Sequence, residues 1–114
     1  MKNDCIFCAI VAGEIPSEKL YEDEHVIIIR DIAPQAKEHF LMIPKVHAAN
    51  WSELTDAQAS VIGSCMRAYD AFARKQGLTN GYRMVINCGA DGKQTVPHLH
   101  IHLLGGEPLS EKMS

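Results

Sequence analysis

The stretch PHLHIHLL, residues 97–104, decides the fold prediction because it combines a strand pattern with three titratable rings. Single aliphatic residues separate its histidines, so that His98, His100 and His102 alternate with Leu99, Ile101 and Leu103. Successive side chains of a β-strand point to opposite faces. The alternation therefore predicts a strand whose aliphatic face joins the core and whose histidines share the other face.

Three interpretations of the histidine face are open at this point. In the first, it is a solvated polar surface. In the second, it is a zinc site, because a His-x-His pair on a strand can direct two nitrogens at one metal. In the third interpretation it holds a reactive imidazole, with the flanking rings as proton donors and electrostatic support. Threonine, lysine or glutamate would serve a solvated surface as well as histidine, so we favour the other two.

Length and composition are those of one globular domain spanning residues 1–114, with 46% apolar and 22% charged residues. The net charge of −3 argues against a nucleic-acid-binding surface, which normally has a basic patch. No apolar run approaches the ~18 residues that a membrane span needs. The N-terminal residues do not resemble a signal peptide. We expect a cytoplasmic protein whose four cysteines are metal ligands or buried thiols rather than disulfides.

Patterning predicts an antiparallel α+β domain in which one long helix is inserted among hairpin-linked strands. A short helix is expected over residues 5–12, where Gly13 and Pro16 end it. The β-branched and alternating segments predict five strands, at 19–22, 25–30, 38–43, 81–89 and 97–104.

The long helix is predicted over residues 56–76 from its end signals and its periodicity. Thr55 and Gln58 form a capping-box pattern before it, and Gly77 follows a basic last turn. Apolar residues at helical spacing form one broad face: Leu54, Val61, Ile62, Cys65, Tyr69, Phe72 and Ala73.

The segment CIFC, residues 5–8, has the spacing of a structural zinc knuckle, which needs two further nitrogen or sulfur ligands. A redox dithiol is the alternative, but it would favour a βαβ context that this segment lacks. His47, just after Pro44, and one end histidine of the triplet are the candidate partners. The remaining residues of these types, Cys65, Cys88 and His25, are expected to be two small buried residues and one surface histidine.

Taken together, these motifs resemble those of the histidine triad (HIT) superfamily. The stretch HLHIHLL fits the signature of that superfamily, in which three histidines alternate with apolar residues. The likeness also covers CIFCAIVAGEIP, YEDEHV, RDIAPQAKEHFLMIPKVH and VINCGADGKQTVPHLHIHLLGG, in that order. The chain is most similar to the nucleotide-binding branch, the small purine-nucleotide phosphoramidases. The resemblance implies α+β subunits whose five-stranded sheets, each with one long and one short helix, join in a homodimer as one ten-stranded sheet. It also implies cleavage of the bond between the α-phosphorus of a nucleoside monophosphate and an amine.

Catalytic roles follow from the resemblance, residue by residue. His100 matches the nucleophile that forms a nucleotidyl-histidine intermediate. His102 matches the ring that contacts the phosphate and helps to protonate the departing amine. His39 matches a further histidine of the site. We expect one nitrogen of His100 to donate to a backbone carbonyl, which leaves the other unprotonated for attack.

Nucleotide-binding roles are implied in the same way. Asp31 matches the ligand of the ribose hydroxyls, and Asn87 and Thr95 match groups that hydrogen-bond the phosphate and leaving group. The apolar walls of the purine slot match five residues for which core packing is nearly as plausible: Ile6, Phe7, Ile10, Ile29 and Ile32.

Relatives with the CxxC pair use it for structural zinc, and the resemblance implies the ligands Cys5, Cys8, His47 and His98 here. In that case His98 would have a structural role as a zinc ligand, and His100 and His102 would carry out the reaction. We expect the homodimer to be built on the 56–76 helix and the 81–88 strand, which would otherwise present an unpaired edge. A partner could cover a second apolar set on the helix: Ala57, Met66 and Ala68.

Three alternative functions are kept open by the sequence. One is a dinucleoside polyphosphate hydrolase of the same superfamily. The second is an AMP-binding regulatory module with weak catalysis. The third is a zinc hydrolase in which His98, His100 and His102 all coordinate the metal.

Overall fold

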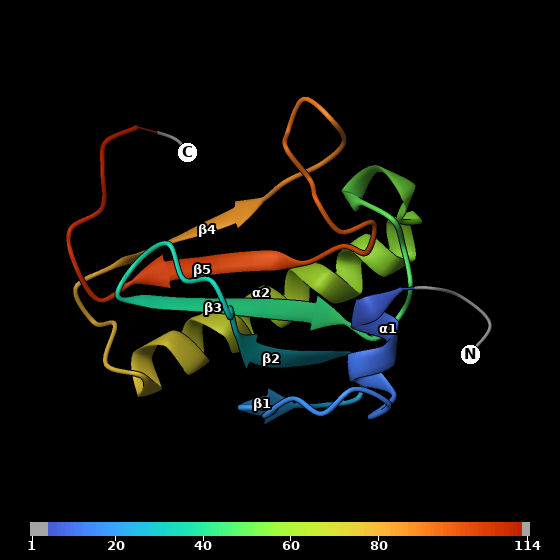
Figure 1. Cartoon of the computed structure of the whole chain (residues 1–114), viewed down its shortest axis with the longest axis horizontal. Helices are drawn as coiled ribbons and strands as arrows, with labels where there is room; N and C mark the ends of the chain where they lie inside the picture. The colour runs from blue at the N-terminus through green and yellow to red at the C-terminus, as the bar shows by residue number, and fades with distance from the viewer. Residues whose placement is uncertain (1–4, 113–114) are drawn as a thin grey trace.

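The computed structural model describes residues 5–112 and forms one five-stranded antiparallel sheet with a helix on each face (Figure 1). The strands are β1 Tyr21–Glu22, β2 Val26–Arg30, β3 Glu38–Pro44, β4 Tyr82–Ile86 and β5 Ile101–Gly105, in the order β1-β2-β3-β5-β4. The helices are α1 Ile6–Val11 and α2 Asp56–Lys75, and a 3-10 turn spans Trp51–Glu53. The predicted α+β fold with one long and one short helix is confirmed.

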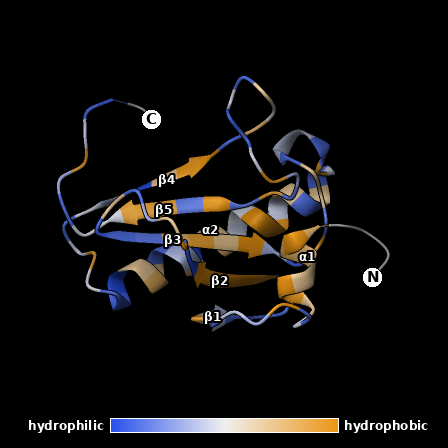
Figure 2. Cartoon of the chain, viewed as in Figure 1, coloured by the Kyte–Doolittle hydropathy of each residue, from blue (hydrophilic) through white to orange (hydrophobic). Residues whose placement is uncertain are grey.

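β3 is the central strand of the sheet, and its neighbour β2 is β-branched over Val26–Ile29, where every residue is buried. A carboxylate oxygen of Asp23 shapes the turn before β2 by accepting the backbone N–H groups of His25 and Val26, at 2.7 and 2.9 Å. The strand is orange along most of its length in Figure 2, which agrees with a strand covered on both faces.

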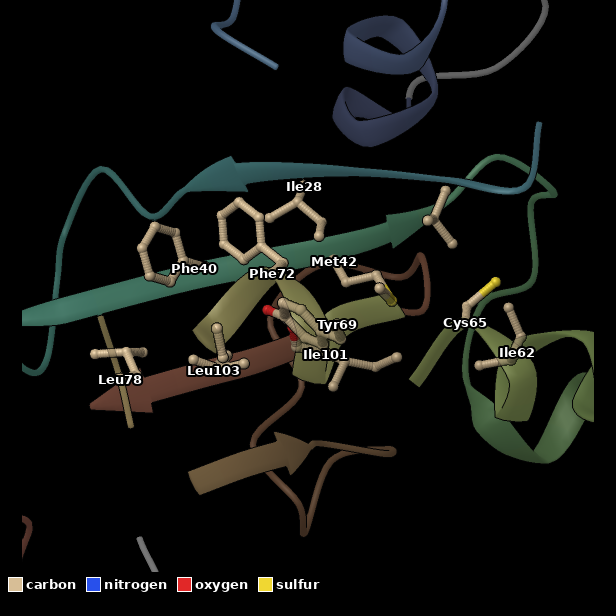
Figure 3. Close-up of a cluster of buried hydrophobic side chains, with 12 residues drawn as sticks. Ile28, Phe40, Met42, Ile62, Cys65, Tyr69, Phe72, Leu78, Ile101 and Leu103 are labelled. Atoms are coloured by element: carbon tan, nitrogen blue, oxygen red, sulfur yellow. The ribbon is translucent and has the colours of Figure 1, made fainter. Parts of the chain in front are cut away.

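The face of the sheet under α2 holds the larger core. The helix begins with the predicted capping box, in which Thr55 and Gln58 each accept a backbone N–H of the other. Figure 3 shows its side chains meeting those of the strands, and the Tyr69 hydroxyl donates to the Ile101 carbonyl at 2.9 Å. The predicted apolar face is confirmed except at Val61, which is exposed.

The opposite face carries α1, which packs mainly against β2 and β3. Phe7 and Ile10 pack there against a cluster formed by Ile27, Ile29, Leu41 and Ile43. On this side of the sheet, β5 and β4 are therefore left for a site. Among residues 5–112, no helix is long and apolar enough to cross a membrane.

The last strand begins at Ile101, so the prediction of a strand over 97–104 is wrong at its start. Pro97 has no N–H to donate. The next two backbone N–H groups bond outside the β3 ladder, from His98 to Val96 at 2.8 Å and from Leu99 to Ala48 at 2.8 Å. His98 and His100 thus precede the strand, and only His102 lies within it.

Candidate active site and metal centre

The reactive-imidazole candidate, His100, is buried with only 6% of its surface exposed. Its Nδ1 lies 2.8 Å from the carbonyl oxygen of His98. A carbonyl oxygen only accepts, so Nδ1 carries the proton and Nε2 keeps its lone pair. The predicted backbone partner of this ring is confirmed. The edge-on ring of Phe7, with centroids 5.0 Å apart, fixes its orientation further.

His39 and His102 form a second pair of rings, brought together by the β3–β5 register. Leu41 pairs with His102 and His39 with Leu104, so both histidines lie on the α1 side of the sheet. His39 Nδ1 accepts the backbone N–H of Gln35 at 3.0 Å, which places its proton on Nε2. That Nε2–H donates to Nδ1 of His102 at 2.9 Å. The proton of His102 consequently lies on Nε2, the nitrogen that is not bonded to His39.

Burial keeps both rings of this pair neutral. It lowers the pKa of His102 to about 4, with further lowering by the neighbouring His100 and His39 and an opposing effect of Asp31. Burial also lowers the pKa of His39, against the attraction of the Asp31 carboxylate, whose oxygen is 3.5 Å from Nε2. At neutral pH each of these two rings therefore carries one proton, on its Nε2.

Four predicted metal ligands converge at the N-terminal end of α1. Nδ1 of His98 lies 3.2 Å from Cys5 Sγ, 3.6 Å from Cys8 Sγ and 3.2 Å from His47 Nδ1. Cys8 Sγ is also 3.2 Å from His47 Nδ1. In a tetrahedral zinc site, neighbouring ligand atoms lie roughly 3.3–3.8 Å apart, as follows from the Zn–N and Zn–S bond lengths. The geometry of these donors therefore fits zinc.

The other nitrogen of His98 supports the same conclusion. Nε2 lies 2.8 Å from the carbonyl oxygen of Pro44, so this nitrogen carries the proton and Nδ1 is left to face the two sulfurs. Metal-bound histidines commonly donate their second N–H in this way. Burial lowers the pKa of His98, which keeps the ring in the neutral form that binds metal.

The three histidines of the triplet do not converge on one point. His98 belongs to the Cys5–Cys8–His47 cluster, whereas His102 belongs to a separate group with Asp31 and His39. A zinc hydrolase in which all three coordinate is therefore contradicted by the geometry. The interpretation as a solvated surface is also wrong, since His98 and His100 are buried.

Of the three polar residues predicted to bind the nucleotide, Asp31 and Asn87 lie near His39 and His102. Asp31 follows β2 and accepts the backbone N–H of Ala33 at 2.8 Å through Oδ1. The side chain of Asn87 donates to the Gly92 carbonyl at 2.7 Å and lines the cavity beside His102. Thr95 is exposed and does not line that cavity.

The five residues predicted for a purine slot divide by exposure. Three are buried in the cluster beneath α1: Phe7, Ile10 and Ile29. Ile6 is 49% exposed and Ile32 is 101% exposed, so both are available to a ligand.

A cavity of about 390 Å³ opens beside His102 on the α1 side of β5 and β4, and we refer to it as the His102 cavity. Three residues predicted for the site line it: His39, Asn87 and His102. The other lining residues were missed by the sequence reasoning: Gln35, Arg83, Val85, Leu104, Leu109 and Ser110. Alternation with Asn87 could have placed Arg83 and Val85 on the same face as Asn87, but it does not indicate a role for either residue.

The remaining cysteines and histidine lie outside this site. Cys65 is buried as predicted, and His25 is on the surface as predicted. Cys88 is exposed, 3.5 Å from the Ser52 hydroxyl, because β4 ends at Ile86 rather than at 89. No disulfide joins the four cysteines, all of which lie within residues 5–112.

Comparison with known proteins gives consistent matches over nearly the whole chain. The HIT domain family matches residues 12–109. An uncharacterized HIT-like protein of Synechococcus elongatus is 48% identical over 110 residues, which is 96% of each chain. The solved structure of a HIT family hydrolase from Clostridium thermocellum has a TM-score of 0.92 at 43% identity, covering 100% of this chain and 99% of that one.

A zinc-bound relative is also among the solved structures. A Zn-bound histidine triad family protein from Mycobacterium smegmatis has a TM-score of 0.80 at 34% identity, covering 96% of this chain and 82% of that one.

Proposed function

The chain belongs to the HIT domain family, and from that premise we propose that it is a hydrolase of purine nucleoside phosphoramidates. The reaction cleaves the bond between the α-phosphorus and an amine and releases a nucleoside monophosphate. One observation carries the proposal: the 2.8 Å hydrogen bond from His100 Nδ1–H to the His98 carbonyl, which leaves Nε2 as a nucleophilic nitrogen. A neutral imidazole meets less repulsion from the anionic phosphoryl group than a carboxylate would.

In the first step, Nε2 of His100 attacks phosphorus and forms a nucleotidyl-histidine as the P–N bond to the amine breaks. The amine takes a proton from Nε2 of His102, the nitrogen that points away from His39. The phosphoryl anion favours the charged form of His102 and so opposes the effect of burial on its pKa. The ring can therefore take up a proton on Nδ1 with the substrate, while the Nε2–H of His39 turns to the Asp31 carboxylate oxygen 3.5 Å away. The charged ring then delivers its Nε2 proton to the amine.

In the second step, water attacks the nucleotidyl-histidine and gives its proton to His102. The bond between phosphorus and Nε2 of His100 breaks, and the nucleoside monophosphate leaves. Before the substrate binds, His39 acts as a positioning residue, because its Nε2–H holds Nδ1 of the neutral His102 ring at 2.9 Å.

Substrate binding is assigned to groups around this reaction centre. The carboxylate of Asp31 accepts hydrogen bonds from the ribose hydroxyls, and Asn87 contacts the phosphate or the leaving group. Ile6 and Ile32 offer exposed apolar surface to the base, backed by the buried residues Phe7, Ile10 and Ile29. Thr95 is a weaker candidate, since it does not line the His102 cavity.

We also propose that Cys5, Cys8, His47 and His98 hold one structural zinc ion, which the two thiolates would neutralise. The zinc, when bound, cross-links the start of α1, the segment after β3 and the approach to β5. The residues of the chain do the chemistry, and His98 contributes to it through its backbone carbonyl.

The proposed assembly is a homodimer joined through β4, the edge of the sheet next to β5. Pairing of two such strands would produce a ten-stranded sheet. Met66 on α2 is half-buried and suits this interface. Ala57 does not, because it lines a separate groove with His25 and Lys45, where β2 begins and β3 ends.

The test compares wild type, His100→Ala and the control His25→Ala on adenosine 5′-phosphoramidates of simple amines. We expect His100→Ala to lose several orders of magnitude in kcat while it binds AMP with nearly unchanged Kd. The control removes an exposed histidine outside the site and should leave both parameters unchanged. When the wild-type reaction is stopped without acid, mass spectrometry should show a nucleotidyl adduct on the peptide that contains His100.

Other outcomes would select other functions. Faster turnover of diadenosine polyphosphates than of phosphoramidates would indicate a dinucleoside polyphosphate hydrolase. Tight AMP binding with turnover far below about 1 s⁻¹ would indicate a nucleotide-binding regulatory module. Retention of most activity by His100→Ala would show that the nucleophile is assigned wrongly.

A further inference from the structure

Arg83 brings a cation into the His102 cavity from the edge strand β4. The β4–β5 register pairs Val85 with His102 and Arg83 with Leu104. Directly paired residues lie on one face of a sheet, so Arg83 is on the same face as His102, one diagonal step away. Diagonal neighbours are roughly 7–8 Å apart, which is within reach of an arginine side chain.

The guanidinium of Arg83 forms no ion pair with any carboxylate among residues 5–112. Its hydrogen bond runs from Nη2 to the backbone carbonyl of Ser110, at 2.6 Å. A guanidinium has five N–H donors, and a neutral carbonyl satisfies only part of that capacity. The cation therefore faces the cavity without a counter-charge.

Nearby acidic groups are held by other partners. Glu38 pairs with Arg30 at 2.9 Å, and Glu107 accepts the backbone N–H of Lys37 at 2.7 Å. Asp31 is held by the Ala33 N–H and lies by His39. None of these carboxylates forms an ion pair with Arg83, although Glu107 and Arg83 line a second cavity together.

The position of Arg83 relative to the reaction centre indicates which part of the substrate it would contact. The nucleoside is assigned to the side of α1 and Asp31, on β2 and β3. The His102 cavity extends from His39 on β3 across β5 to Arg83 on β4, near the point where the C-terminal segment turns back from the end of β5 (Figure 1). A leaving group that departs from phosphorus away from the nucleoside enters this cavity and approaches Arg83.

We propose that Arg83 forms an anion subsite for the leaving group, so that the preferred amines carry a carboxylate or a phosphate. This inference rests on the proposed function, whose leaving group it specifies. A carboxylate or phosphate offers two oxygens in the plane of the guanidinium, a stronger partner than one carbonyl. The anion replaces the Ser110 carbonyl and releases the C-terminal segment from Arg83.

The test measures binding in a His100→Ala background, so that its result does not depend on turnover. Titration calorimetry compares the AMP phosphoramidates of β-alanine and of β-alaninamide, which differ in one charge at nearly constant shape. The phosphoethanolamine and ethanolamine derivatives form the second pair and separate phosphate from carboxylate recognition. We expect the acidic member of at least one pair to bind about tenfold more tightly.

Arg83→Gln in the same background should abolish this ratio, and Arg83→Lys should retain part of it. Arg67→Gln is the matched control, since it removes one exposed positive charge from α2, outside the cavity. The Kd for AMP itself should be equal in all these proteins, which shows that the nucleotide site is folded. Equal affinities for both members of both pairs, or an unchanged ratio in Arg83→Gln, would overturn the inference.

Failure of the proposed function gives a different pattern. Wild type would then cleave none of the four phosphoramidates, while the charge-dependent ratio of Kd values still reports on Arg83. If wild type does turn the substrates over, the same preference should appear in kcat/KM.

Discussion

The carbonyl oxygen of His98 lies 2.8 Å from Nδ1 of His100, so the first histidine of the triplet orients the ring of the second. His98 is itself fixed by its ring, through Pro44 on one nitrogen and the two cysteines on the other. The metal cluster and the proposed nucleophile are thus connected by a single residue. Disturbing the cluster should therefore affect both stability and chemistry.

Removal of a metal ligand tests this connection. We expect Cys8→Ser to reduce zinc from one ion per chain, to lower Tm by about 5 °C or more, and to lower kcat more than AMP affinity. Elemental analysis, thermal unfolding and phosphoramidate kinetics measure the three effects. Cys88→Ser, a change at an exposed cysteine outside the cluster, serves as the control. Absence of zinc from wild type purified without chelators would contradict the metal assignment.

Ribose recognition by Asp31 is tested by pairing a variant with an altered ligand. Asp31→Asn keeps the side-chain shape and the acceptor for the Ala33 N–H but removes the charge. We expect it to bind AMP about tenfold more weakly, because hydrogen bonds to a charged acceptor are lost, with little change in kcat. Wild type should discriminate against 2′,3′-dideoxy-AMP by a similar factor, and the variant should not. Undiminished discrimination in Asp31→Asn would exclude this residue as the ribose ligand.

The sequence predicted the strands, both helices and the Cys5–Cys8 pair because each depends on a short local pattern, whereas the choice of His98 as a further metal ligand follows from the family resemblance. Alternation, a capping box and the CxxC spacing act over a few residues, and the family motif joins them in order. The start of β5 was predicted wrongly because Pro97 and the contact of Leu99 with Ala48 divert the chain before Ile101. Arg83 was missed because its role depends on the β4–β5 register and on the return of the C-terminal segment, which no local pattern encodes.

Acid sensitivity should follow from the buried imidazole of His102. Its pKa is about 4 in the folded protein and about 6.5 when unfolded. The folded state thus binds fewer protons between these values. The stabilisation is complete above pH 6.5 and is lost as the pH falls towards 4, by on the order of 1 kcal/mol because solvent screens this partly exposed ring. His39 shifts in the same direction.

Urea unfolding of the zinc-saturated protein at pH 7.5, 6.5 and 5.5 measures this loss. We expect His102→Gln to show a shallower decrease than wild type, because its side chain does not titrate. His25→Gln removes an exposed histidine and should follow the wild-type curve. Parallel curves for wild type and His102→Gln would contradict the assignment of the acid sensitivity to His102.

The edge of the sheet at β4 provides the last prediction, a homodimer at micromolar concentration. β1, the opposite edge, has only two residues, whereas β4 has five and offers a longer unpaired ladder. Ile86 at the end of β4 is 36% exposed. We expect light scattering to give twice the chain mass for wild type and a shift towards monomer for Ile86→Lys, since a charge on an edge strand opposes pairing. Ile15→Lys is the matched control, because Ile15 is 38% exposed but lies outside the sheet. The two variants should have similar Tm values, so that a change in mass reports association rather than unfolding. A monomeric wild type, or equal masses for the two lysine variants, would contradict assembly through β4.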